Sequence, residues 1–259
     1  MEGAIRPWID ALVFGCGWVA LAAAALVAAA SAVMGLRPAP AVMGLALCGT
    51  LVVYSVDRLR DLRRDRQTAP LRAAFVDRHR GWLEFQTVAA GVLALVCGWL
   101  AGPAVIAVAA GVALFGFLHR RLKRSLLAKP LYLTLSWTAV SVALPAVHAG
   151  NARHVPWVAA IVALTVQSNV VLSNLRDREG VAHRIGTRRA LTLAGGFLIP
   201  ALALALLGPT QIRPLVWLPL AMAPAVAAFR PSERYGGGIV DGALLAGALL
   251  ALAQGSLGG

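Results

Sequence analysis

The chain has 259 residues, of which 59% are hydrophobic and 14% are charged, and its formal net charge is +13. Soluble domains contain about 25% charged residues. The composition therefore excludes an ordinary soluble domain and predicts a polytopic membrane protein embedded in the lipid bilayer. In a soluble chain the excess of Lys and Arg would indicate nucleic-acid binding. Here the excess follows from membrane topology, and we expect no nucleic-acid partner.

Apolar segments between charged residues, prolines and glycines predict about nine transmembrane helices, because a helix needs about 20 apolar residues to cross the hydrocarbon core. The first segment is longer than the apolar core of a signal peptide, which is about 7–15 residues, so we expect it to remain as a span. The sequence predicts a single all-α transmembrane domain over 1–259, with its helices around a central cavity. The expected limits are 9–34, 41–60, 82–100, 103–119, 131–149, 155–175, 189–208, 213–229 and 238–255.

Lys and Arg fall mainly on one side of this nine-helix arrangement. Of the 24 such residues, only Arg37, Arg153 and Arg213 fall on the other side, which leaves 21 on the side of the N-terminus. The positive-inside rule then predicts a cytoplasmic N-terminus, in a bacterial inner membrane. The longer loops share this side, so we expect the active site at the cytoplasmic face. They are expected near 61–81, 120–130, 176–188 and 230–237.

A dense run of charge follows the second expected helix. Asp57, Asp61 and Asp65 recur every fourth residue, a spacing that keeps them on one side of a helix with a drift of about 40° per step. Carboxylates at the mouth of a membrane helix can hold a divalent cation. Alternatively, Asp57 and Asp61 form surface ion pairs with Arg60 and Arg64, worth a few tenths of a kcal/mol. We expect Asp65 to be a solvated loop charge.

Polar residues at helical spacing lead from the expected spans to the charged clusters. A charge at the bilayer centre costs about 2.5–3.5 kcal/mol, so such stripes usually face the interior of a helix bundle. Hydrogen bonding between helices is the alternative explanation for small polar side chains. For the stripes that end in aspartate we expect a cavity wall, which includes Tyr54 before Asp57, and Asn169 and Ser173 before Asp177.

A second charged cluster follows the sixth expected helix, on the same side of the membrane as the first. Asp57, Asp61, Asn174 and Asp177 offer the hard oxygen ligands that Mg²⁺ prefers, and Mg²⁺ commonly binds substrate phosphates as well. The neighbouring arginines suit a diphosphate group. Together the clusters predict a site for a lipid diphosphate held through magnesium, with its tail in an apolar cavity. These arginines are Arg58, Arg60, Arg64, Arg176 and Arg178.

Three segments of the chain resemble the UbiA superfamily of intramembrane prenyltransferases. The segment from Asp57 to Asp61 resembles the DxxxD part of the first aspartate-rich motif of the family. The segment from Asn174 to Glu179 resembles the NxRDxE opening of the second motif, and the segment from Arg120 to Arg124 resembles the basic LKR segment. The expected nine helices and long cytoplasmic loops also resemble the architecture of the family.

The resemblance implies an enzyme that transfers the isoprenyl group of an isoprenyl diphosphate to an electron-rich acceptor, aromatic or lipid, with Mg²⁺ as cofactor. It implies that Asp57, Asp61 and Asp177 are catalytic and hold the metal, together with Asn174. It also implies diphosphate contacts from the basic segment, namely Lys123 and Arg124.

Two positions leave a non-catalytic alternative open. Val53 stands where the first family motif begins with Asn, and Val181 stands where the second motif closes with Asp. The alternative is a catalytically inactive membrane protein on the same scaffold, which binds or moves an isoprenoid or another lipid.

Overall fold

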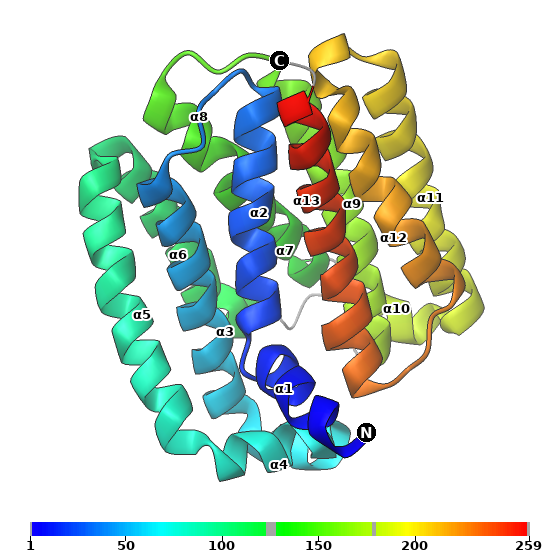
Figure 1. Ribbon diagram of the computed structural model, residues 1–259. Coiled ribbons are helices and arrows are strands. Elements are labelled where there is room, and N and C mark those ends of the chain that lie inside the picture. Colours follow the sequence, from blue (N-terminus) through cyan, green and yellow to red (C-terminus); the bar gives the residue numbers. More distant parts are fainter. Residues whose placement is uncertain (1, 123–127, 178–179, 258–259) are drawn as a thin grey trace.

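The computed structural model describes the backbone of residues 2–122, 128–177 and 180–257, and the side chains of 8–115, 130–177 and 180–255 (Figure 1). All secondary structure in these ranges is helical, without a strand. Three short segments have 3₁₀ or π geometry. The elements are α1 (Glu2–Phe14), α2 (Gly17–Val33), α3 (Pro40–Thr68), α4 (Pro70–Arg78), α5 (Arg80–Ala101), α6 (Pro103–Leu122), α7 (Ala128–Thr138), η1 (Ala139–Ala143), α8 (Leu144–Ala149), α9 (Val155–Arg176), α10 (Gly180–Ile185), α11 (Thr187–Leu207), η2 (Thr210–Val216), α12 (Trp217–Ala227), η3 (Tyr235–Val240) and α13 (Asp241–Leu257).

Six helical segments in the described part of the chain are long and apolar enough to cross a membrane, which makes this an all-α membrane protein. A seventh is added if α1 and α2 count as one span, bent by 64°. This number is lower than the roughly nine spans that hydropathy predicts. The six segments are Pro40–Thr68, Arg80–Ala101, Pro130–Ala149, Val155–Arg176, Thr187–Leu207 and Tyr235–Gly255.

The remaining two expected spans lie outside these six. The span expected at 103–119 coincides with α6, which is helical from Pro103 to Leu122, and its described apolar segment is Pro103–Phe115. The span expected at 213–229 is divided between η2 and α12, which is only 11 residues long. Pro214 lies inside η2 and Pro224 inside α12, and a proline removes a backbone donor and interrupts a helix.

The charged segment after the second expected span is helical rather than a loop. α3 is 29 residues long and continues to Thr68, well past its apolar part. Pro70 then begins α4, as proline commonly does at the first helical position, where no backbone donor is needed. The chain turns at Ala69, so α4 folds back beside the charged end of α3. This turn places Arg72 of α4 next to Asp65 of α3, and the two side chains form a buried contact.

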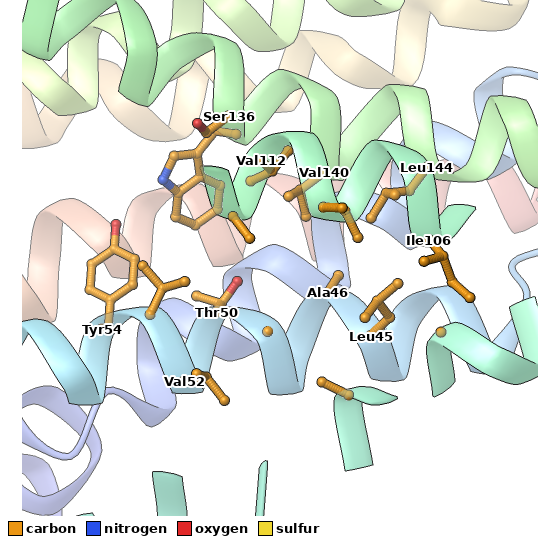
Figure 2. Close-up of a pocket in the computed structure, with 18 of the residues that line it drawn as sticks. Leu45, Ala46, Thr50, Val52, Tyr54, Ile106, Val112, Ser136, Val140 and Leu144 are labelled. Carbon is orange, nitrogen blue, oxygen red and sulfur yellow. The ribbon is translucent and has the colours of Figure 1, made fainter. Parts of the chain in front are cut away.

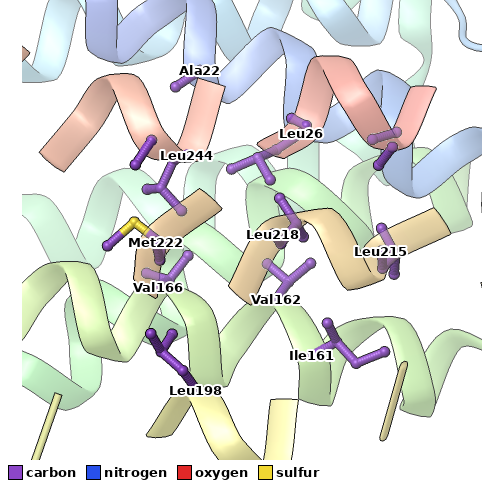
Figure 3. Packing of buried hydrophobic residues seen from close by; sticks show 14 of the residues in the cluster. Ala22, Leu26, Ile161, Val162, Val166, Leu198, Leu215, Leu218, Met222 and Leu244 are labelled. Atoms are coloured by element: carbon purple, nitrogen blue, oxygen red, sulfur yellow. The ribbon is translucent and has the colours of Figure 1, made fainter. Parts of the chain in front are cut away.

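α2 is the central helix of the main hydrophobic core. It is almost entirely buried from Val19 to Val33 and consists largely of alanine. Small side chains let neighbouring helices approach closely, which is the main source of helix association in a membrane. Larger side chains from α9, α12 and α13 complete this core (Figure 3), including Val162, Leu218 and Leu244.

A second, smaller core lies at one end of α3. It joins α2, α3, α5, α6 and α8, and we call it the α3–α6 core; its buried members are Val27, Val42, Leu45, Ala46, Ala101, Val105 and Leu144. α5 forms the outer edge of this half of the molecule (Figure 1). Its outward side chains, such as Leu95 and Trp99, are largely exposed, as expected of a helix surface that faces lipid.

Candidate functional site

An apolar cavity of about 590 Å³ lies among α3, α5, α6 and the helical segment from α7 to α8 (Figure 2). Tyr54 lies at one end, and Leu45, Ile106 and Leu144 lie at the other. Small residues on all sides leave the space open, and the few polar groups include Thr50 and Ser136. The volume is within the range of small-molecule sites, about 300–1,000 Å³.

The cavity lies on one side of α3 and does not extend between α3 and α9. Tyr54 is among the lining residues, as the sequence predicts. Asn169 and Ser173 of α9, which the sequence also assigns to the wall, are not among them. Asn169 instead donates hydrogen bonds to Val240 O and Asp241 Oδ1, each at 3.2 Å. The two polar stripes therefore serve different purposes, one lining a cavity and the other joining helices.

The cavity-facing side of α3 continues into the first aspartate cluster. Thr50 and Val53 line the cavity, and Asp57 follows Val53 after one helical turn, on the same face. Asp61 follows after a further turn. Asp57 is exposed and Asp61 is partly buried. These carboxylates therefore stand beyond the Tyr54 end of the cavity.

A different face of α3 points into the protein. Arg58 lies on this face, and its Nε is buried without a hydrogen-bond partner among the described residues. Asp65 lies two turns farther on the same face and is 4% exposed. The expectation that Asp65 is a solvated loop charge is therefore wrong. By Asp65 the drift of about 40° per step has turned the aspartate row about 80° away from Asp57.

Arg72 from α4 neutralises Asp65. It donates from Nε to Oδ2 and from Nη2 to Oδ1, both at 2.7 Å. Its Nη1 also lies 3.7 Å from Asp177 Oδ1, at the end of α9. Arg176 donates to both oxygens of Asp177, from Nε at 2.8 Å and from Nη2 at 2.9 Å. A continuous chain of alternating charges thus joins α3, α4 and α9.

The electrostatics of Asp177 are dominated by these arginines. Burial would raise the pKa of its carboxyl, but the charges of Arg176, Arg72 and Arg58 and the hydrogen bonds from Arg176 together outweigh burial. The pKa of Asp177 is consequently held well below its usual range. Asp177 is therefore ionised at neutral pH and acts as the anionic partner of buried guanidinium groups.

Arg176 is also confined by η3 on its other side. A Cβ placed on Gly236 would lie 2.2 Å from Arg176 Cδ and 2.6 Å from Nη1, so any larger residue there would displace the Arg176 side chain. Asp241, the first residue of α13, is an electrostatic neighbour of both Arg176 and Arg58. Asp241 is recognisable in the sequence as a residue with a specific partner, because an acidic side chain within an apolar helix is energetically expensive.

Glu233, which lies just before η3, fixes the position of α4. Its Oε1 accepts a hydrogen bond from Leu71 N at 3.1 Å, and its Oε2 accepts one from Arg72 N at 2.8 Å. A carboxylate at a helix N-terminus satisfies otherwise unpaired donors and complements the helix dipole. The sequence carries no local signal for this contact, since the partners are 161 and 162 residues apart.

The residues predicted to ligate magnesium do not converge on one point. Asp57 and Asp61 lie beyond the cavity, whereas Asp177 is bound by arginines. Asn174 is buried and lines a separate cavity of about 200 Å³, as does Val181. Within the described ranges, no group of three or more His, Cys, Asp or Glu side chains could hold a metal ion.

Part of the predicted ligand set still fits magnesium. Mg²⁺ needs only one or two carboxylates when substrate phosphates and water complete its coordination. Asp57 and Asp61, one turn apart on the cavity-facing side of α3, suit that arrangement. Asp177 does not suit it, because both of its oxygens accept hydrogen bonds from Arg176.

The arginines predicted to bind diphosphate divide into an inner and an outer group. Arg58 and Arg176 lie inside the protein, close enough to repel each other electrostatically. Arg60 and Arg64 are exposed on α3. Lys123, Arg124 and Arg178 lie outside the described residues.

Comparisons with models of protein families, with curated proteins and with solved structures give no match to this chain. The resemblance to the UbiA superfamily rests on the motif residues of the sequence.

Proposed function

We propose that the protein is an intramembrane prenyltransferase of the UbiA type, which transfers the isoprenyl group of an isoprenyl diphosphate to an electron-rich acceptor. The observation that carries the proposal is the position of the apolar cavity, whose Tyr54 end lies one helical turn from Asp57 and Arg58. An apolar tail fits the cavity, and a diphosphate fits the charged residues beyond it.

The proposal includes an orientation in the membrane. The charged ends of α3 and α9 face the cytoplasm of a bacterial cell, as the bias of Lys and Arg supports. The bent α1–α2 pair, α6 and the η2–α12 segment complete the crossings in this arrangement. The substrate then meets the protein with its head group in the cytoplasm and its chain in the bilayer.

In the proposed reaction, guanidinium groups bind the diphosphate. The buried Nε of Arg58 is a donor without a partner in the described structure, and a charge-assisted hydrogen bond to a phosphate oxygen would satisfy it. Asp177 holds Arg176 in a fixed orientation through two hydrogen bonds. Asp57 and Asp61 would hold Mg²⁺, which, when bound, supplies positive charge that neutralises the leaving diphosphate.

The chemical step breaks the bond between the allylic carbon and the diphosphate oxygen, whose electron pair leaves with diphosphate. The apolar cavity excludes water from the resulting allylic cation. Tyr54 and Trp137 line the same part of the cavity, and aromatic faces stabilise cations. The acceptor then supplies the electron pair of the new bond and releases a proton to solvent.

The test is product formation by purified protein in lipid nanodiscs, with labelled isoprenyl diphosphates, membrane-extract acceptors and Mg²⁺. Asp57→Asn should reduce turnover by at least about 10²-fold, the size of effect seen when a transition-state charge contact is lost. Asp77→Asn is the matched control, because Asp77 lies in an exposed ion pair with Arg66. Unchanged turnover in Asp57→Asn would reject the assigned site.

The arginine contacts of Asp177 favour a second candidate, a non-catalytic protein that binds or moves an isoprenoid or another lipid. It uses the same cavity and the same arginines but no metal. Saturable binding of an isoprenyl diphosphate without any prenylated product, under the conditions above, would select this candidate.

A further inference from the structure

The cavity has a closed end, remote from Tyr54. Leu45, Ile106 and Leu144 lie there (Figure 2), and both leucines belong to the buried α3–α6 core. A Cβ placed on Gly98 would lie 3.6 Å from Ile106 Cγ1 and 3.9 Å from Leu45 Cδ1. A methyl group added at Gly98 would thus make ordinary contacts with both neighbouring helices, so α3, α5 and α6 pack closely at this end. Leu45 and Leu144 are 9% and 1% exposed and close the cavity toward the protein interior, whereas Ile106 is 42% exposed and lies at the outer side of this end.

The length of the cavity follows from the geometry of α3, which is continuously α-helical along its wall. Leu45 and Tyr54 are nine residues apart, and a rise of about 1.5 Å per residue separates them by about 14 Å. Three backbone bonds of an extended peptide span about 3.6 Å, so the four carbon–carbon bonds of an isoprene unit span about 5 Å. Three units therefore match the distance from the head-group end to the closed end.

We infer that the cavity accepts an isoprenyl chain of about three isoprene units, and that Leu45, Ile106 and Leu144 set this limit. The inference rests on the proposed function, which places the diphosphate beyond Tyr54. A shorter chain leaves the closed end unfilled and loses packing contacts there. A longer chain has to fold back or leave the cavity.

Gly49 offers a way to shorten the cavity at one point. It lines the cavity between Leu45 and Tyr54, and a Cβ placed on it meets nothing within 4 Å. A larger side chain there points into open space, so the helix need not move. Only five residues then separate the obstruction from Tyr54, or about 7.5 Å, which is enough for one isoprene unit.

The experiment measures equilibrium binding of isoprenyl diphosphates of one, two, three and four units to the full-length protein in nanodiscs. We expect the wild type to bind the three-unit ligand at least about tenfold more tightly than its neighbours in length, as for other apolar pockets. Gly49→Leu should weaken binding of the three-unit ligand by a similar factor and leave binding of the one-unit ligand unchanged. Gly195→Leu is the matched control, because Gly195 on α11 also has open space and does not line the cavity.

A second variant lengthens the cavity instead of shortening it. Ile106→Ala removes part of the closed end and should shift the preference toward four units, so it decides the question if Gly49→Leu does not fold. A wild type that binds all lengths equally, or a preference that neither variant shifts, would overturn the inference but not the proposed function. Failure of the wild type to bind an isoprenyl diphosphate of any length would reject the proposed function itself.

Discussion

Arg72 and Asp65 form a buried ion pair in which two guanidinium nitrogens each donate to a different carboxylate oxygen at 2.7 Å. The two side chains are 8% and 5% exposed. The pair joins α4 to α3, and Arg72 extends the contact to Asp177 at the end of α9. The charged end of the protein is consequently organised by a residue outside every motif of the sequence.

Arg72→Met should destabilise the protein by about 3–5 kcal/mol, because it leaves Asp65 buried without a positive partner. The change is measured as a shift in thermal unfolding midpoint. Arg66→Met is the control, since the Arg66–Asp77 pair is exposed and such pairs contribute about 0–1 kcal/mol. Equal shifts in the two variants would contradict the structural role of Arg72. The double variant Arg72→Met with Asp65→Leu should recover part of the loss, because no charge is then left unpaired.

Gly236→Ala should displace the Arg176 guanidinium, because the new Cβ would lie 2.2 Å from Arg176 Cδ. Overpacking of this kind costs about 1–3 kcal/mol, and diphosphate affinity should fall with it. Gly196→Ala on α11 is the control, since nothing lies within 4 Å of its Cβ position. There alanine should be neutral or stabilising by up to about 1 kcal/mol. A Gly236→Ala protein with wild-type stability and affinity would show that Arg176 is free to move.

The stability of the protein should fall in acid partly through Asp177, whose pKa is lowered in the folded state. A lowered pKa contributes stability that is complete above the unfolded value, about 3.9, and is lost as the pH falls from there toward the folded pKa. Asp177→Asn should therefore be less stable than wild type at pH 7, and the difference should shrink below about pH 4. Thermal unfolding of both proteins between pH 7 and pH 3 measures this difference in stability. A difference that does not depend on pH would contradict the lowered pKa of Asp177 in the folded protein.

Glu233→Gln should weaken the attachment of α4, because the carboxylate accepts hydrogen bonds from two backbone donors at the helix N-terminus. Loss of such a cap costs about 0.5–2 kcal/mol. Hydrogen exchange at Leu71 and Arg72 should accelerate more than exchange in the membrane helices. Glu84→Gln is the control, since Glu84 forms an exposed pair with Arg80 on its own helix. Unaltered exchange at the start of α4 would contradict the capping role.

Local patterns in the sequence predict much of the helical structure and part of the site. Hydropathy marks the apolar segments, and helical periodicity places Asp57 beyond the cavity-lining face of α3. The predicted limits of the helices fail where a proline interrupts an apolar segment or where a helix continues past its apolar part. Prolines divide the span expected at 213–229, and α3 continues to Thr68 although its last turns are charged.

What the sequence determines by itself is the all-α membrane class and the spacing of charged groups along each helix, because hydropathy and helical geometry are local properties. What only the tertiary structure decides is the partner of each charge. The rotation of a helix about its axis is set by packing against its neighbours. In α3 this rotation leaves Asp57 exposed and buries Asp65. Contacts such as Glu233 with α4, or Asn169 with Asp241, join residues far apart in the chain. No periodicity within a single helix encodes them.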